Sequence, residues 1–166
     1  IELGSDPVKV KNIVKAVSSV ISIPVLAKLG LTDKIIESSG KALEAGAKGL
    51  VLINTVKAMY IDVFTLRPVL TARYGGLSGP PIHPIAVRVI YDVYKEYTAD
   101  IIGVGGVCDW TTAAEFIAAG AKAIQIGTAL MTNEGIVNEV LNGLKKWIQY
   151  HNVKSIKELV GTAHKI

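Results

Sequence analysis

Residues 101–128 contain two apolar runs that each end in a glycine turn: IIGVGG at 101–106 and AIQIGT at 123–128. A helix-length segment separates them, so the stretch is typical of strand, glycine turn, helix, strand and second glycine turn. Glycine lets the backbone approach an anion closely and point N–H groups at it. In barrels of alternating strands and helices, phosphates bind at the ends of the last two strands. A plain tight turn explains either run alone, but the pair predicts a phosphate site at Gly105, Gly106, Gly127 and Thr128.

The rest of the chain continues the alternation of helices and strands. Asp6-Pro7 is typical of a helix start, because aspartate caps the first turn and proline is tolerated there. Val10, Ile13 and Val17 then give one apolar face at helical spacing. The expected helices begin after Asp6, Thr32-Asp33 and His83-Pro84 and span Thr111–Ala119, about Glu134–Tyr150 and Ser155–Val160, and the expected strands are Ile23–Leu29, Gly49–Thr55, Asp100–Val107 and Ala123–Ala129.

Strands that alternate with helices imply parallel pairing and right-handed crossovers. Two folds fit four such strands: a small doubly wound sheet, and half of an eight-stranded (β/α)8 TIM barrel. Polar or glycine residues follow every expected strand, and a barrel places all strand ends around one mouth. We therefore expect residues 1–166 to form the C-terminal half of one α/β TIM-barrel domain, roughly its last four strands and helices. The chain begins with Ile1 rather than methionine, which favours the view that it belongs to a longer protein.

Polar residues at two strand ends are candidates for ligand binding. Lys28 ends an otherwise apolar strand. Its side chain either reaches solvent at the bottom of the barrel or places a cation at the mouth, where it would stabilise an anionic group. Asn54 and Thr55 end the next strand and form either a helix cap or turn, or a pair of donors and acceptors for a small planar ligand.

Residues 56–82 have no regular period and contain the run GGLSGPP at 75–81. A connection of this length carries a small hairpin or has a function, and we expect the glycine-rich run to cradle a ligand. His83, which opens the next helix, is expected to be a surface residue rather than a base. Cys108 has no histidine nearby that would make it an obvious nucleophile.

Composition narrows the function classes. The net charge is +4, but the lysines are scattered and only 6% of residues are aromatic, which does not favour nucleic-acid binding. The apolar runs are far shorter than the roughly 18–20 residues of a membrane span, and no His, Cys or carboxylate cluster has metal-ligand spacing. A single cysteine excludes an internal disulfide, so we expect a reducing, cytoplasmic compartment.

Five motifs in this order resemble the C-terminal half of dihydroorotate dehydrogenase, and the resemblance covers nearly the whole chain. The glycine-rich loop is the most specific of them, whereas the final two turns are shared by many flavin barrels. The motifs are PVLAKL (24–29), LINT (52–55), GGLSGP (75–80), IGVGG (102–106) and QIGTA (125–129).

The resemblance implies an FMN-containing (β/α)8 barrel that oxidises dihydroorotate to orotate in pyrimidine biosynthesis. Lys28 would lie beside the flavin ring, Ile53 and Gly79 would contact FMN, and Asn54 and Thr55 would hydrogen-bond the orotate ring. Gly105, Gly106, Gly127 and Thr128 would hold the FMN phosphate. The Ile-Asn-Thr run resembles the class 1B form, which implies an iron–sulfur/FAD electron-transfer subunit that passes electrons to NAD, and a homo-oligomer is expected.

The chain also departs from the family pattern. The family's catalytic base lies on a loop upstream of the equivalent of Ile1, and Cys108 does not occupy that position, so no catalytic base is expected in this chain. The run Lys28-Leu29-Gly30-Leu31 is shorter than the usual loop beside the flavin. The alternatives are another FMN barrel, such as a dihydropyrimidine dehydrogenase-like or dihydrouridine-type reductase, and a non-catalytic phosphate-binding half-barrel.

Overall fold

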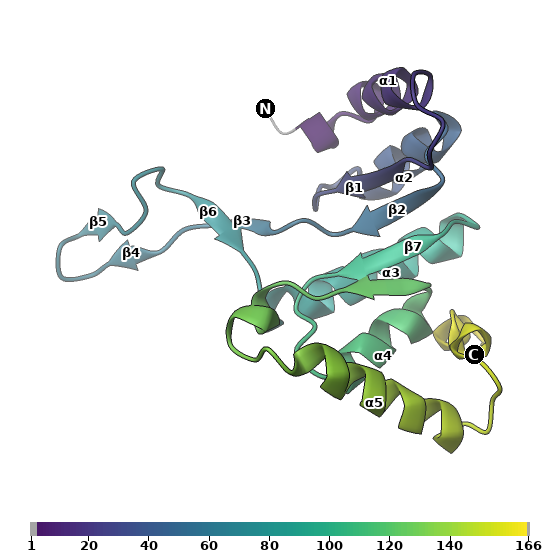
Figure 1. Ribbon diagram of the computed structural model, residues 1–166. Coiled ribbons are helices and arrows are strands. Elements are labelled where there is room, and N and C mark those ends of the chain that lie inside the picture. The colour runs from purple at the N-terminus through teal and green to yellow at the C-terminus, as the bar shows by residue number, and fades with distance from the viewer. Residues whose placement is uncertain (1–2, 166) are drawn as a thin grey trace.

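A four-stranded parallel sheet is the centre of the computed structural model, which describes residues 3–165. Its strands lie side by side in chain order, and every pairing is parallel (Figure 1). A doubly wound sheet reverses its strand order at a switch point, and the described sheet has no such reversal. The predicted parallel α/β architecture is therefore confirmed, with strands β1 (Leu26–Leu29), β2 (Gly49–Leu52), β7 (Ile101–Val104) and β8 (Ala123–Gln125).

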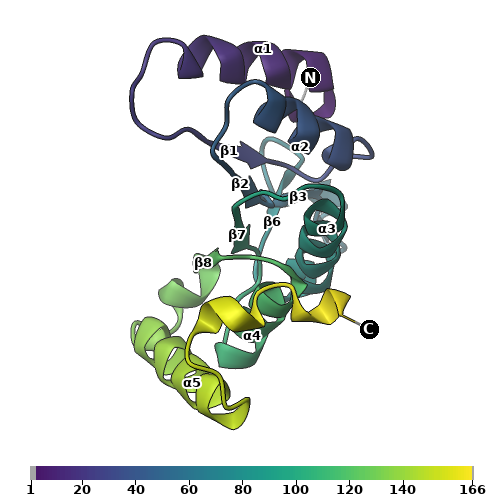
Figure 2. The same cartoon turned by 90° about the vertical axis from the view of Figure 1, so that its right-hand side faces the viewer.

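One layer of helices covers one face of this sheet. Figure 2 shows α2, α3 and α4 on the same side of the strands, and each helix contacts the next along the chain. Short 3-10 turns complete the described chain at Leu3–Ser5, Pro80–Ile82, Thr128–Met131, Ile156–Leu159 and Thr162–His164. The helices are α1 (Pro7–Ser18), α2 (Ile35–Glu44), α3 (His83–Glu96), α4 (Trp110–Ala119) and α5 (Ile136–Tyr150).

The opposite face of the sheet is partly open. Along β1 the side chains alternate: Ala27 and Leu29 are buried under the helices, whereas Leu26 is 48% exposed and Lys28 is also exposed. The register aligns Lys28 with Val51 and Ile102 on the neighbouring strands, so these residues share that face. The face is open at β1 only, because Val51 is buried and Ile102 is half-buried. An apolar strand that leaves one side uncovered is what a sector of a larger barrel would present.

The helix starts follow the expected chemistry in one case and not in another. The Asp6 side chain accepts hydrogen bonds from the first turn of α1, as predicted. The predicted cap at Thr32-Asp33 is wrong, because α2 begins at Ile35 after Lys34, which makes no side-chain cap. The expected apolar face of α1 is also only partly buried, since Ile13 and Val17 are 46% and 40% exposed.

An ion-pair cluster joins α1 to α2. Lys11 Nζ on α1 lies 2.7 Å from Glu44 Oε1, and Lys41 Nζ lies 2.9 Å from Glu44 Oε2. The hydrogen bond from Lys11, and to a smaller extent the one from Lys41, stabilises the charged carboxylate and lowers the pKa of Glu44 to about 2.

The segment after β2 forms a projecting arm of two short antiparallel ribbons (Figure 1). Strand β3 (Val56–Ala58) pairs with β6 (Gly75–Leu77), and β4 (Ile61–Asp62) pairs with β5 (Arg67–Pro68). A small hairpin, one of the two alternatives for residues 56–82, is thus present, and a function for this segment remains a prediction. The arm starts directly after Asn54 and Thr55, so it lies at the carboxyl edge of the sheet.

Candidate functional site

Two of the cavities at the carboxyl edge of the sheet contain most of the predicted site residues. We call the first, of about 380 Å³, the lysine cavity, and the second, of about 210 Å³, the glycine cavity. The lysine cavity is lined by Leu3, Gly4, Lys28, Gly30, Leu31, Thr32, Asn54, Thr55, Val56 and Lys57. The glycine cavity is lined by Gly79, Pro80, Gly106, Val107, Cys108, Gly127, Thr128, Ala129, Thr132, Asn133 and Ile136.

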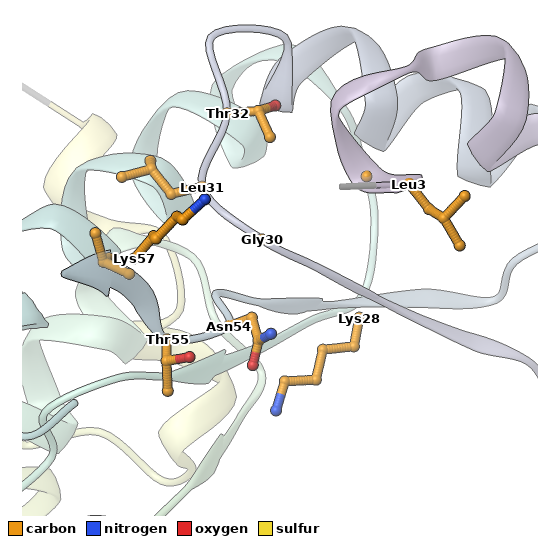
Figure 3. A pocket seen from close by; sticks show the side chains of 10 residues that line it. Leu3, Lys28, Gly30, Leu31, Thr32, Asn54, Thr55 and Lys57 are labelled. Carbon is orange, nitrogen blue, oxygen red and sulfur yellow. The ribbon is translucent and has the colours of Figure 1, made fainter. Parts of the chain in front are cut away.

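The lysine cavity combines a cation with an amide and a hydroxyl. Lys28 is exposed and makes no hydrogen bond or ion pair with any residue between 3 and 165. The backbone N–H of Asn54 donates to the Leu29 carbonyl at 2.9 Å, which holds Asn54 beside the end of β1. Figure 3 shows the Lys28 and Asn54 side chains close to each other, whereas Lys57 points away toward Leu31. A positive charge beside neutral donors and acceptors suits an anionic, hydrogen-bonding ligand.

Three segments that are distant in sequence meet at the glycine cavity. Thr128 Oγ1 donates to Ser78 Oγ at 2.9 Å, which ties the turn after β8 to the GGLSGPP run. A methyl group added at Gly106 would lie 2.7 Å from the Gly79 carbonyl oxygen, so the turn after β7 packs directly against the same run. The sequence alone gave no reason to single out Ser78 within this run.

The backbone of the glycine cavity has amides that are free to bind a ligand. Among the described residues, the N–H groups of Gly106, Gly127 and Thr128 donate no hydrogen bond within the chain. A methyl group added at Gly127 would meet nothing within 4 Å, so the space beside this glycine is open. Unpaired amides around a small open space are the donors that an anionic oxygen requires.

Ile53 and Gly105 lie behind these linings rather than in them. Ile53 is buried, and its N–H donates to the Val104 carbonyl at 2.9 Å, which connects the end of β2 to the end of β7. Gly105 has a φ of +133° and packs against Ala86 and Ile82. The structure thus brings Lys28, Asn54 and Thr55 together at one cavity, and Gly79, Gly106, Gly127 and Thr128 at the other. That one ligand occupies both cavities remains a prediction.

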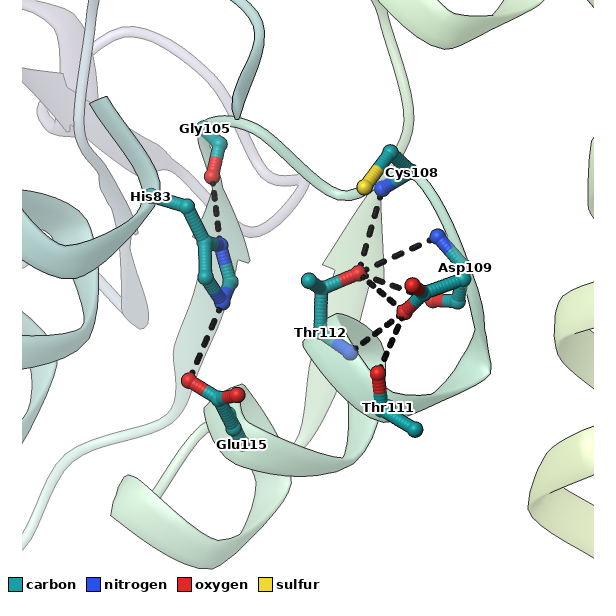
Figure 4. A network of polar contacts seen from close by, with 7 residues as sticks. All are labelled: His83, Gly105, Cys108, Asp109, Thr111, Thr112 and Glu115. Carbon is teal, nitrogen blue, oxygen red and sulfur yellow. Dashed lines mark hydrogen bonds and ion pairs between the residues drawn. The ribbon is translucent and has the colours of Figure 1, made fainter. Parts of the chain in front are cut away.

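His83 is not the surface residue that we expected. It is only 6% exposed, and its Nδ1 lies 3.0 Å from the Gly105 carbonyl oxygen, as Figure 4 shows. Its Nε2 faces Glu115 Oε2 at 3.4 Å, and its ring packs against Phe116 with centroids 4.7 Å apart. The residue is buried because it continues the inner face of α3 that includes Ala86 and Ile90.

Asp109 fixes the start of α4 beside the same turn (Figure 4). Its carboxylate accepts from the Thr112 N–H at 2.8 Å and from Thr111 Oγ1 at 2.7 Å, while Thr112 Oγ1 accepts from the Asp109 N–H at 3.1 Å. Burial opposes the charged form, but the hydrogen bonds from Thr112 and Thr111 outweigh it and lower the pKa of Asp109. The reciprocal cap therefore holds the loop from Gly106 to Asp109 at a rigid helix end.

Residues 3–165 contain neither a metal-binding cluster nor a membrane-spanning helix. No group of three or more His, Cys, Asp or Glu side chains is arranged to hold a metal ion. None of the described helices combines the length and apolar character needed to cross a membrane.

The family model and the individual relatives that match this chain indicate the same family. Residues 1–148 match the family model described as dihydroorotate dehydrogenase. A protein of Aeropyrum pernix, provisionally named dihydroorotate dehydrogenase A (fumarate), is 49% identical over 99% of this chain and 54% of the relative. Proteins of Pyrococcus furiosus and Thermoplasma acidophilum are 42% and 47% identical over 100% and 98% of this chain, and both are named dihydroorotate dehydrogenase B (NAD(+)), catalytic subunit.

These matches cover 56% and 54% of the Pyrococcus and Thermoplasma proteins, so the chain spans about half the length of the curated relatives it matches. The matched region contains both cavities and all five motifs that carried the resemblance. The chain belongs to the dihydroorotate dehydrogenase family.

Proposed function

We propose that this chain is the C-terminal half of an FMN-dependent TIM barrel that oxidises dihydroorotate to orotate in pyrimidine biosynthesis. The observation that carries the proposal is the convergence of a free cation, polar side chains and free amides on the carboxyl edge of one parallel sheet. Barrel enzymes of this architecture place their active sites at that edge. The family assignment and the open face of the sheet support the same conclusion.

The residues present fit FMN at both ends of the cofactor. Gly106, Gly127 and Thr128 offer unpaired amides for the phosphate, and the open space beside Gly127 leaves room for it. Lys28 offers an unpaired cation for an electron-rich ring. FMN, when bound, supplies the hydride-accepting chemistry that no amino-acid side chain can provide.

The side chains and backbone of this chain have further roles in the proposed reaction. The Lys28 ammonium stabilises negative charge at the lysine cavity. Asn54 and Thr55 orient the substrate ring through an amide and a hydroxyl that can both donate and accept. Ile53 and Gly79 contact the cofactor. Gly79 lines the glycine cavity, whereas Ile53 is buried behind the linings and would make its contact through backbone or packing.

The catalytic base comes from outside this chain in our proposal. Cys108 lines the glycine cavity and not the lysine cavity, so it is poorly placed to take a proton from a substrate held by Asn54 and Thr55. The other half of the barrel would supply the base and cover the open face of the sheet.

A reduction assay on the protein as its gene encodes it tests the proposal. Anaerobic addition of dihydroorotate to the FMN-loaded protein should bleach the flavin absorbance within a catalytic cycle, whereas dihydrouracil should leave it unchanged. Bleaching by dihydrouracil alone would assign the protein to the dihydropyrimidine dehydrogenase-like alternative. A purified protein that is colourless and takes up no FMN would favour the non-catalytic half-barrel.

We further propose that electrons pass to NAD through an iron–sulfur/FAD subunit. The relatives named as B-type catalytic subunits support this choice, whereas the Aeropyrum relative carries a fumarate name. Turnover with NAD that requires a copurifying flavin and iron–sulfur protein would support the proposal. Turnover with fumarate by the purified protein alone would contradict it.

A further inference from the structure

His83 has a place in the structure that the proposed function does not explain. It is the first residue of α3, it is buried, and it lies directly behind the turn that follows β7. An isolated imidazole is costly to bury unless its nitrogens have partners. The Nδ1 atom has one, the carbonyl oxygen of Gly105, and must carry a proton in order to donate to it.

The hydrogen bond acts on a peptide unit that is unusually free to rotate. Gly105 and Gly106 flank this unit with φ values of +133° and +73°, and neither has a side chain that would favour one orientation of the peptide. A Gly-Gly peptide can therefore turn its carbonyl to either side of the chain at little steric cost.

Peptide planarity converts the position of the carbonyl into the direction of an amide. The Gly105–Gly106 bond is trans, so the Gly105 C=O and the Gly106 N–H point in opposite directions within one plane. His83 holds the carbonyl on its own side of the turn, and the N–H then points away from His83. Gly106 lines the glycine cavity, and its N–H has no partner among the described residues.

The imidazole is itself fixed by its surroundings. Its ring packs on Phe116 of α4. Its Nε2 lies 3.4 Å from the Glu115 carboxylate but makes no hydrogen bond among the described residues, so the packing rather than Glu115 holds the ring. The donor to Gly105 is thus held by two neighbouring helices, α3 through its backbone and α4 through its packing.

We propose that His83 is a positioning residue that locks the Gly105–Gly106 peptide with its N–H directed into the glycine cavity, and so increases affinity for the phosphate of FMN. The proposal rests on the FMN site proposed above. A neutral hydrogen bond of this kind corresponds to roughly a 3- to 10-fold change in an equilibrium constant.

Two substitutions at His83 distinguish the contribution of Nδ1 from that of Nε2. In His83→Asn the side-chain amide nitrogen takes the place of Nδ1 and can still donate to Gly105, whereas in His83→Gln it takes the place of Nε2 and cannot. Glu115→Gln is the matched control, because it removes the charge beside Nε2 and leaves the Gly105 contact intact. Thermal unfolding of each variant checks that the fold is kept.

The experiment measures dissociation constants for FMN and for riboflavin, which lacks the phosphate, by quenching of flavin fluorescence in the protein as its gene encodes it. We expect His83→Gln to bind FMN roughly 3- to 10-fold more weakly with riboflavin affinity unchanged, and His83→Asn and Glu115→Gln to match the parent protein. Equal losses of FMN affinity in the Asn and Gln variants, or equal losses of affinity for both flavins, would overturn the role of His83 but not the phosphate site. A parent protein that does not prefer FMN to riboflavin would overturn the phosphate site, and the role of His83 with it.

Discussion

Gly106 and Gly127 line the same cavity but differ in what an added methyl group would meet. At Gly106 the methyl would lie 2.7 Å from the Gly79 carbonyl oxygen and 2.8 Å from His83 Cβ, on a residue with a φ of +73°. At Gly127 it would enter open space, and φ is −118°. Alanine at these two positions should therefore perturb the protein in different ways.

For Gly106→Ala we expect a loss of both stability and binding. A left-handed conformation costs alanine about 1–2 kcal/mol, and forcing a methyl group against packed backbone adds about 1–3 kcal/mol. A total of about 2–5 kcal/mol lowers the melting temperature of a domain of this size by roughly 4–20 °C. The turn must also shift, which displaces the Gly106 amide, so FMN affinity should fall as well.

For Gly127→Ala we expect a loss of binding alone. The free energy of unfolding should change by less than about 0.5 kcal/mol, as for exposed positions generally. FMN should bind roughly 5- to 150-fold more weakly, because a methyl group in space that the phosphate needs costs about 1–3 kcal/mol. Differential scanning calorimetry and flavin-quenching titrations measure the two effects. Wild-type stability in Gly106→Ala would refute the packing of the turn, and wild-type FMN affinity in Gly127→Ala would refute the phosphate site.

Three further predictions concern charge and capping. Lys28→Ala should slow flavin reduction by dihydroorotate by on the order of 100-fold in stopped-flow experiments, while the exposed α3 control Lys95→Ala should not; a normal rate in Lys28→Ala would remove this residue from the reaction. Because the pKa of Glu44 is lowered to about 2, its ion pairs should stabilise the fold above about pH 4.5 and lose that effect as the pH falls toward 2. The free energies of urea unfolding of Glu44→Gln and the parent protein should therefore differ at pH 6 and converge near pH 2. A difference that is the same at both pH values would contradict the pKa shift. Asp109→Ala should lower the free energy of unfolding by about 0.5–2 kcal/mol through loss of the cap at Thr112, and an unchanged melting temperature would contradict the capping role.

The order and type of the main elements could be predicted because they depend on local patterns. Apolar runs that end in glycine predicted the strands β7 and β8, and the Asp6-Pro7 pair predicted the start of α1. The start of α2 was misplaced because Thr32-Asp33 has the right residue types, yet the chain turns through Lys34 before the helix begins. Capping residues show that a helix can start but not that tertiary packing starts it there.

The candidate site could be predicted only as a set of strand ends. Nothing in the sequence indicated that Lys28 and Gly106 would line separate cavities, because that depends on the curvature of the sheet. His83 was missed although a signal existed: it stands three and seven residues before Ala86 and Ile90, the spacing of the buried face of α3. A histidine at this spacing in an apolar helical series is typical of a buried residue, and a buried imidazole requires a hydrogen-bond partner.

The most direct test of the central claim is a calorimetric titration of FMN, and in parallel riboflavin, into the purified protein as its gene encodes it. We predict one FMN per chain, bound roughly tenfold or more tightly than riboflavin because the phosphate forms charge-assisted hydrogen bonds with the free amides. Absence of binding, or equal affinity for the two flavins, would contradict the claim that these strand ends hold FMN.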